Sequence, residues 1–227
     1  MEKSLRQRVL TQLGAIAIAA GTGLFEPAAS LLTIPESVII DLVESSEDDP
    51  ATKRRYLGLL AMDARTAVRE RVAQAVRTLA ERLPGEAEEL LRGLSHDVSS
   101  RVRAEVGRSL ASMLAAAPPL DRPAIVGRWT LATRASERAA IARALRSRTP
   151  VFVSDLALEE LSTDPDPTVR ASVARAMARR IQEAPDAYAR TLSRLAEDID
   201  PRVERTARRL LAALTSTQEG GALSTRA

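Results

Sequence analysis

Arginine side chains recur at a regular interval along this chain and could place several guanidinium groups on one surface. A guanidinium group is planar, always charged and presents five N–H donors, so it binds the oxygens of carboxylates and phosphates in pairs. The spacing therefore predicts an anion-binding surface. The six candidate residues are Arg108, Arg143, Arg146, Arg175, Arg179 and Arg209.

A helical segment that returns five times must position these arginines. Its copies begin at Val68, Val102, Glu137, Val169 and Val203, at steps of 34, 35, 32 and 34 residues. Self-similarity at this period is typical of stacked-helix repeats, in which each unit buries its apolar face only against its neighbours. Because aromatic residues make up only 2% of the chain, the core is expected to consist of Ala, Leu, Val and Ile.

The apolar stripe of each copy indicates which helix face points outward. The position two residues beyond the middle of the stripe points nearly opposite to it, at 100° per residue. Gln74 occupies this outward position in the first copy, and arginine occupies it in the other four. A solvated helix face is the alternative interpretation of the same pattern. The aligned stripes are Val68, Val72 and Val76; Val102, Val106 and Leu110; and Val169, Val173 and Met177.

Each repeat is predicted to form two helices joined by a short polar turn. Prolines lie at many of the helix boundaries, where a missing N–H is tolerated. No strand-type alternation persists, so the fold class is predicted to be all-α. The predicted helical pairs are 51–62 and 66–82, 85–94 and 99–116, 122–132 and 135–147, 151–162 and 167–182, and 186–197 and 201–216.

The turns between paired helices resemble those of the HEAT-repeat family over roughly residues 50–214. In that family an Asp in the turn and an Arg six residues later form a ladder between stacked units. Two units depart, because Ala132 stands where Asp is expected and Glu204 where Arg is expected. The resemblance implies a right-handed α–α superhelix whose second helices line a concave surface. The matching pairs are Asp63 with Arg69, Asp97 with Arg103, and Asp164 with Arg170.

The two ends of the chain do not follow the repeat. Residues 1–49 are predicted to be a divergent cap with helices over 3–20 and 35–47, since a solenoid needs its exposed apolar end covered. Residues 50–214 hold the five helical pairs. The polar, aperiodic residues 215–227 are predicted to be a disordered tail.

The uncharged stretch 9–25 allows two interpretations. It follows basic residues and has the outline of a secretory signal peptide, which would place the protein in a secreted or periplasmic location after loss of residues 1–19. It is short for a membrane span, and Glu2 and Gln12 favour a buried capping helix instead. The capping interpretation predicts a cytoplasmic protein that can oligomerise through its N-terminal unit.

The composition limits the chemistry available. There is no cysteine and one histidine, His96, which excludes disulfides, thiolate metal sites and multi-histidine metal sites. No glycine-rich phosphate loop or nucleophile motif is present, so we expect no cofactor, no metal and no catalysis. Trp129 and Tyr56 are expected to pack between helices, and His96 to lie exposed in a turn.

Two binding functions remain. The first is a scaffold or adaptor that binds an acidic protein segment or helix in a concave, arginine-lined groove. The alternative is binding of duplex nucleic acid through its phosphates, remotely like the HEAT-like DNA glycosylases. No aromatic residue occupies the outward aligned positions, which disfavours base stacking. Residues 101–148 carry a net charge of +7 and residues 149–200 a net charge of −4, which favours a partner recognised by charge.

Overall fold

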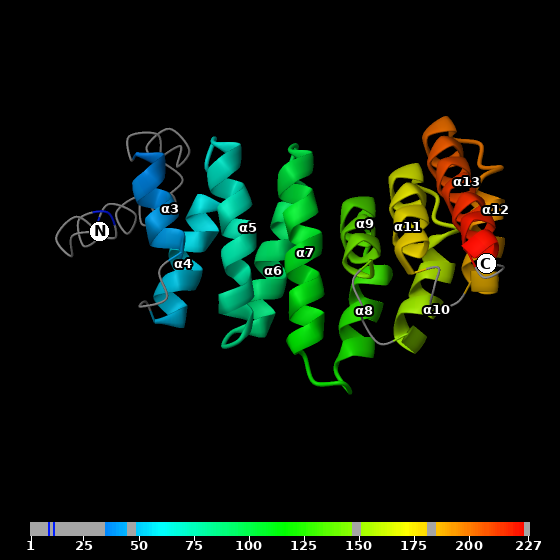
Figure 1. Cartoon of the computed structure of the whole chain (residues 1–227). Helices are drawn as coiled ribbons and strands as arrows, with labels where there is room; N and C mark the ends of the chain where they lie inside the picture. The colour runs from blue at the N-terminus through cyan, green and yellow to red at the C-terminus, as the bar shows by residue number, and fades with distance from the viewer. Residues whose placement is uncertain are drawn as a thin grey trace. The chain divides into compact units, whose positions relative to one another are not determined.

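The computed structural model describes residues 35–44, 49–146, 151–180 and 185–224, together with Val9 and Thr11. The described residues form helices and no strand, which confirms the all-α prediction (Figure 1). The chain divides into two compact units, which we call unit 1 (residues 1–116) and unit 2 (residues 117–227).

The described helices of unit 1 lie in two layers. α3, α5 and α7 follow one another in the first layer, where α5 contacts both neighbours (Figure 1). α4 and α6 form the second layer and pack against α5. The bounds are α3 (Glu36–Glu44), α4 (Pro50–Leu60), α5 (Thr66–Ala80), α6 (Pro84–Ser95) and α7 (Ser100–Ala116).

Unit 2 repeats the same alternation. α11 packs between α9 and α13, while α8, α10 and α12 pack against these helices and α8 also against α10. Helical pairs that recur in this way define a helical-repeat protein; the handedness of the predicted superhelix stays a prediction. The bounds are α8 (Arg122–Thr130), α9 (Ala135–Ala144), α10 (Val151–Leu161), α11 (Pro167–Arg180), α12 (Pro185–Leu195) and α13 (Pro201–Ser224).

Local sequence signals explain where the helices begin. Each predicted helix of residues 50–214 starts within one residue of an observed start. Asp49 caps α4, because its Oδ1 accepts hydrogen bonds from the backbone N–H groups of Ala51 (3.0 Å) and Thr52 (3.1 Å). Pro50 follows as the first helical residue, where its missing N–H has no cost.

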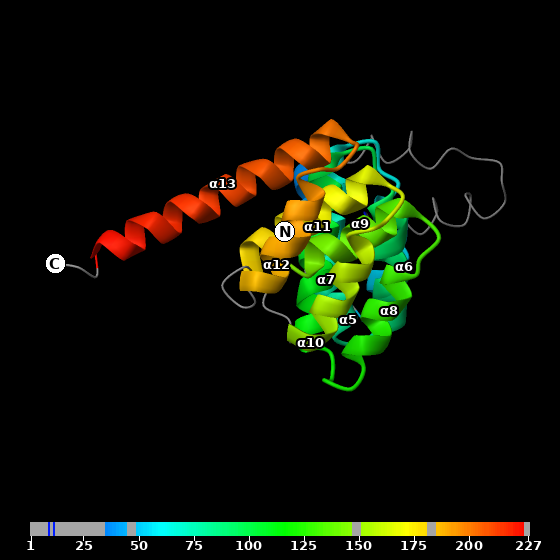
Figure 2. The same ribbon diagram turned by 90° about the vertical axis from the view of Figure 1, so that its right-hand side faces the viewer.

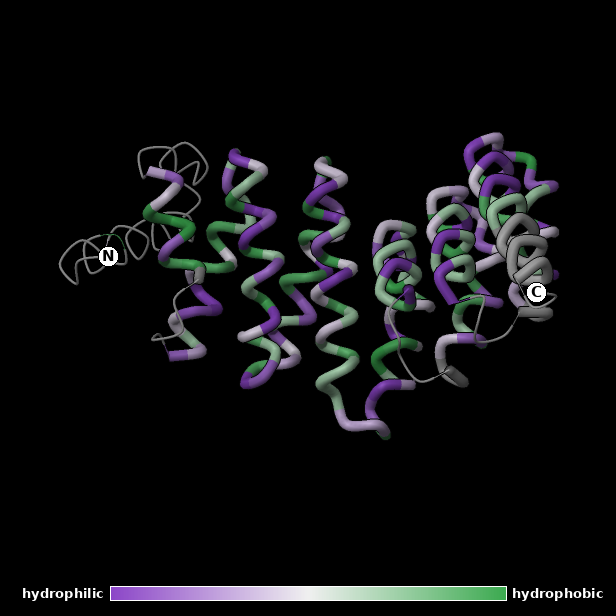
Figure 3. The backbone as a smooth tube through the Cα atoms, in the orientation of Figure 1, coloured by the Kyte–Doolittle hydropathy of each residue, from purple (hydrophilic) through white to green (hydrophobic). Residues whose placement is uncertain are grey.

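The apolar stripes form the core of both units, as predicted. All nine stripe residues have at most 1% of their surface exposed. Figure 3 shows the resulting alternation of apolar and polar positions along α5 and α7. Trp129 is fully buried, which confirms that it packs between helices. The predicted inward face of each second helix is therefore confirmed, and the opposite face points outward.

Helix α3 covers the first full repeat. Ile39, Leu42 and Val43 have no exposed surface, and α3 packs against α5. The hydroxyl of Tyr56 donates a hydrogen bond to the carbonyl of Leu42 (3.4 Å), which joins α4 to α3. The predicted helix 3–20 and the signal-peptide interpretation lie outside the described residues, apart from Val9 and Thr11.

Removal of residues 1–47 is expected to cause aggregation or dimerisation. The truncation removes α3 and exposes the apolar face of α5 that Ile39, Leu42 and Val43 cover, and a large exposed apolar patch promotes association. Light scattering coupled to size exclusion would measure the change. A truncated chain that stays monomeric at high concentration would show that α3 is dispensable as a cover.

Helix α13 extends further than the sequence indicated. It runs to Ser224, whereas the sequence predicted an end at residue 216. No proline follows Pro201 to stop it. The C-terminal half of α13 extends beyond α11 and α12 (Figure 2). Disorder of residues 215–227 in solution stays a prediction.

Candidate anion-binding surface

Arginine–aspartate contacts join successive turns within each unit. Arg69 donates from Nε to Asp97 Oδ2 (2.5 Å), Arg138 from Nε to Asp164 Oδ2 (2.6 Å), and Arg170 from Nε to Asp198 Oδ2 (2.6 Å). In each case Nη2 completes a paired contact with the second carboxylate oxygen, and Nη1 donates to two carbonyls of the arginine's own turn. We call this series the Arg–Asp ladder, and its role is to hold successive turns together.

The ladder ends where the sequence departs from the repeat. Asp63 is almost fully buried, and its carboxylate accepts both a backbone and two guanidinium hydrogen bonds from Arg65 in its own turn. Arg103 donates to the carbonyls of Asp97 (2.6 Å) and Val98 (2.8 Å), and Ala132 stands at the position where the next Asp would be. The structure therefore assigns these turn residues to packing.

Loss of a ladder arginine is expected to weaken the pH dependence of stability. The hydrogen bonds of Arg170, aided by the N–H of Asp200, lower the pKa of Asp198 against the opposing effect of burial. A lowered folded-state pKa stabilises the fold at pH values above the unfolded-state pKa of about 3.9. This stabilisation is lost as the pH falls below that value and through the lower folded-state pKa. Arg170→Ala should cost about 2 kcal/mol at neutral pH and flatten the acid limb below about pH 4.

Urea unfolding at neutral and acid pH measures this effect. Arg54→Ala is the matched control, because Arg54 pairs with Glu89 (3.5 Å) at the exposed surface, where an ion pair contributes little. Equal loss of stability in both variants, at both pH values, would show that the buried ladder contact has no special role.

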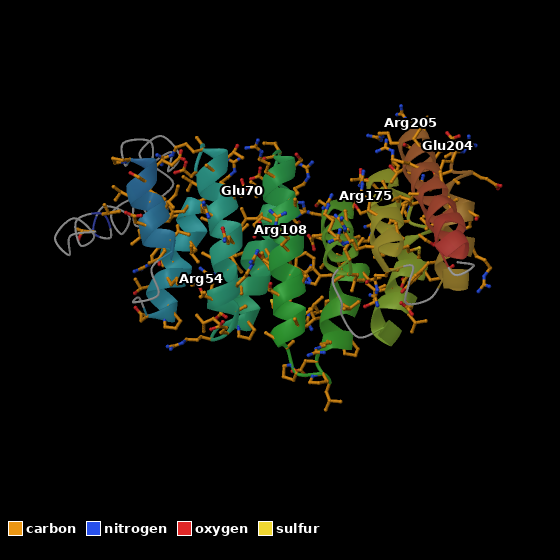
Figure 4. The ribbon with its side chains drawn as sticks, in the orientation of Figure 1. Arg54, Glu70, Arg108, Arg175, Glu204 and Arg205 are labelled. Atoms are coloured by element: carbon orange, nitrogen blue, oxygen red, sulfur yellow. The ribbon has the colours of Figure 1, made fainter. Side chains whose placement is uncertain are left out.

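The candidate arginines lie on the outward face, but their surroundings differ between the units. Arg108, Arg146, Arg175, Arg179 and Arg209 are exposed, and Arg143 is half-buried. Figure 4 labels Arg108 on α7 in unit 1 and Arg175 on α11 in unit 2. Each unit therefore presents its own part of the predicted series.

In unit 1, Arg108 is held by a buried carboxylate that the sequence analysis did not identify as its partner. Glu105 is 5% exposed and lies between two guanidinium groups. It accepts from Arg108 Nε (2.6 Å) on one side and forms a short contact with Arg77 Nη2 on the other. Arg77 also donates to Ser109 Oγ (3.2 Å). Arg108 is therefore part of an ion-paired network and is less available to a ligand than predicted.

In unit 2, four of the five candidate arginines have no such partner among the described residues. We call Arg143, Arg146, Arg175, Arg179 and Arg209 the unit 2 arginine surface. Within the described residues, no side-chain hydrogen bond or ion pair engages Arg146, Arg175, Arg179 or Arg209. Burial lowers the pKa of Arg146, and the positive charges of Arg179 and Arg175 lower it further. Like charges from α11 and from the end of α9 thus lie close together and repel.

Four acidic residues of unit 2 pair with side chains outside the unit 2 arginine surface. Asp164 and Asp198 belong to the ladder, and Glu159 accepts from Thr191 Oγ1 (2.8 Å) and Arg194 Nη2 (3.1 Å). Asp155 accepts a short hydrogen bond from the Tyr188 hydroxyl. These four carboxylates are therefore engaged by residues outside the unit 2 arginine surface.

A buried arginine that the sequence analysis did not single out connects α9 to α11. Arg180, in the last turn of α11, is 1% exposed. Its Nη1 donates to the carbonyl of Leu145 (3.3 Å), the residue that caps α9, and its Nη2 lies 3.9 Å from Asp155 Oδ1. A buried cation is kept in place by its partners, because desolvation without them would be costly. Arg180 therefore fixes the end of α9 against the end of α11.

The remaining candidates are structural. Tyr56, Trp129 and Tyr188 are buried, so none of the aromatic side chains whose exposure the structure describes is available for base stacking. His96 caps the C-terminus of α6 and is half-buried rather than exposed. Among the described residues no group of acidic and histidine side chains has the arrangement of a metal site. None of the described helices is both long and apolar enough to span a bilayer.

Comparisons with known proteins give structural matches only. No family model and no curated protein sequence matches this chain. Among solved structures, an engineered protein is 22% identical with a TM-score of 0.43, covering 83% of this chain and 87% of the match. A second engineered protein is 19% identical with a TM-score of 0.42, covering 95% and 94%. A designed armadillo repeat protein in complex with the peptide (KR)4 is 14% identical with a TM-score of 0.44, covering 91% and 92%. TM-scores below 0.5 establish neither family nor function.

Proposed function

We propose that this protein is a non-catalytic interaction module that binds an acidic segment of a partner protein on the unit 2 arginine surface. The observation that carries the proposal is that Arg146, Arg175 and Arg179 are exposed, repel one another, and have no carboxylate partner within the described residues. Repulsion between like charges opposes folding, and a bound anion relieves it. The same proposal places the chain among HEAT-like repeats, which the Arg–Asp ladder supports.

The difference between the two units favours a binding surface over a helix face that is only solvated. Unit 1 has an arginine at the equivalent position, Arg108, and compensates it with Glu105. Unit 2 has Ala140 and Ser172 at the positions equivalent to Glu105, and both are buried. Within the described residues, Arg175 thus lacks the counterion that Glu105 provides for Arg108. Charge complementarity of this kind gives specificity and a fast association rate.

An acidic protein segment fits this surface better than nucleic acid does. Sequence-tolerant binding of single strands uses exposed aromatic platforms, and the described aromatic side chains are buried. Binding of a duplex by phosphate contacts alone needs many cations and shows a steep salt dependence. Titration with an acidic peptide and with a DNA duplex distinguishes these two binding functions.

Fluorescence anisotropy with two labelled ligands tests the proposal. A glutamate-rich peptide is expected to bind with an affinity that weakens moderately with added salt, because screening acts on the charge pairs. A mixed-sequence DNA duplex is expected to bind more weakly at the same ionic strength. Tight duplex binding with a log–log salt slope of several units would establish the phosphate-backbone function instead. If neither ligand binds, the unit 2 arginine surface is only a solvated helix face.

A further inference from the structure

Three of the unit 2 arginines converge from two adjacent helices, and they form what we call the arginine cluster: Arg146, Arg175 and Arg179. Arg175 and Arg179 are four residues apart on α11, so they lie one above the other on one helix face. Arg146 comes directly after Leu145, the residue that caps α9. The cluster is thus supplied by two turns of α11 and by the end of α9.

A hydrogen bond between the end of α11 and the residue that caps α9 fixes this convergence. Arg180 donates from Nη1 to the carbonyl of Leu145 at 3.3 Å. Arg179 precedes Arg180 in the chain, and Arg146 follows Leu145. The hydrogen bond therefore brings Arg179 and Arg146 together where α9 and α11 both end. Because Arg180 is 1% exposed, the contact lies in the core and the cluster lies above it at the surface.

The positive charge of the arginine cluster exceeds what the C-termini of α9 and α11 can neutralise. α9 and α11 both end here, and the carbonyls of a helix C-terminus carry roughly −0.5 of an elementary charge each. Two helix ends offset about one of the three cluster charges. About two positive charges remain, and no carboxylate among the described residues pairs with the cluster.

We propose that the arginine cluster is a binding site for a dianionic phosphoryl group, carried as a phosphate monoester on the acidic partner. A phosphate monoester carries about −1.5 to −2 charges at neutral pH and three acceptor oxygens, so one group can engage three guanidinium groups. A single carboxylate carries one charge and pairs with one arginine. The inference rests on the proposed function, because it names the anion that the unit 2 arginine surface prefers.

The test uses the full chain and three labelled acidic peptides of one length that differ at one place. The first carries a phosphoserine there, the second a pair of glutamates, and the third an unmodified serine. The phosphoserine peptide is expected to bind about tenfold more tightly than the paired-glutamate peptide, and inorganic phosphate should compete with it. The advantage should fall as the pH drops through about 6, where the monoester takes up its second proton.

Two double variants locate the effect. Arg175→Gln with Arg179→Gln should remove the preference for phosphoserine. Arg101→Gln with Arg190→Gln removes the same charge at exposed positions outside the cluster and should leave the preference intact. Circular dichroism of both variants checks that they fold.

Two results would overturn the inference, and they differ in what they leave standing. Equal binding of the phosphoserine and paired-glutamate peptides, or no competition by inorganic phosphate, would refute the phosphoryl site while acidic-segment binding stands. Failure of all three peptides to bind would refute both proposals.

Discussion

Val173→Asp is expected to unfold unit 2 or to lower its stability by about 3–5 kcal/mol. Val173 has no exposed surface, and it lies at the centre of the α11 stripe, between α9 and α13. An aspartate there would either bury an unpaired carboxylate or remain protonated at a large cost in free energy, and it would also leave the site of the valine poorly packed. Thermal and urea unfolding followed by circular dichroism would measure the loss.

The matched control for this variant is Val98→Asp. Val98 is 90% exposed in the turn between α6 and α7, so the same substitution there should change the free energy of unfolding by about 0.5 kcal/mol or less. A Val173→Asp protein as stable as the Val98→Asp protein would mean that the inward face of α11 has been assigned wrongly.

Reversal of two cluster arginines is expected to weaken binding of a glutamate-rich peptide by about a hundredfold, with little change in stability. The change is Arg175→Glu with Arg179→Glu. Both side chains are exposed, and neither makes a side-chain hydrogen bond within the described residues, so their loss removes few contacts of the folded state. Each reversal replaces an attraction to the peptide by a repulsion. Isothermal titration calorimetry gives the affinity, and a thermal melt gives the stability.

The control reverses two arginines outside the cluster. Arg101→Glu with Arg190→Glu changes the net charge by the same amount, so it separates local recognition from the overall charge of the protein. The control should retain most of the affinity at moderate salt. An equal loss in both double variants would show that net charge alone drives binding, and unfolding of the Arg175 and Arg179 variant would show that these arginines are structural.

The helical repeat could be predicted from the sequence because its signals are local. Spacing such as that of Val169, Val173 and Met177 reflects the period of one helix, and a proline such as Pro201 restricts the backbone at its own position. The spacing identified the turn residues but not their partners. Arg69 pairs with the carboxylate of Asp97 in the next turn, and only with the backbone carbonyl of Asp63 six residues before it. All three stripe residues are buried and α11 begins at Pro167, as the period predicted.

The contact of Arg77 with Glu105 could not be predicted in the same way. Arg108 lies three residues after Glu105 on α7, a spacing that indicates a pair on one helix face. Arg77 reaches the same carboxylate from α5, and that contact depends on distance across the packed helices rather than on sequence separation. Glu105 is buried although charged residues usually lie at the surface. Its carboxylate can be buried because the guanidinium groups of Arg77 and Arg108 pair with it. The role of Arg180 was hidden for the same reason: its partner, the carbonyl of Leu145, lies in the preceding repeat.

Recognition of a partner by charge at the unit 2 arginine surface can be measured by a charge-swap titration. Wild-type protein and the Arg175→Glu, Arg179→Glu variant are each titrated with a glutamate-rich peptide and with a lysine-rich peptide of the same length. We predict that the wild-type protein prefers the acidic peptide and that the variant prefers the basic one. A variant that binds the acidic peptide as tightly as the wild-type protein, and gains no affinity for the basic peptide, would contradict the account.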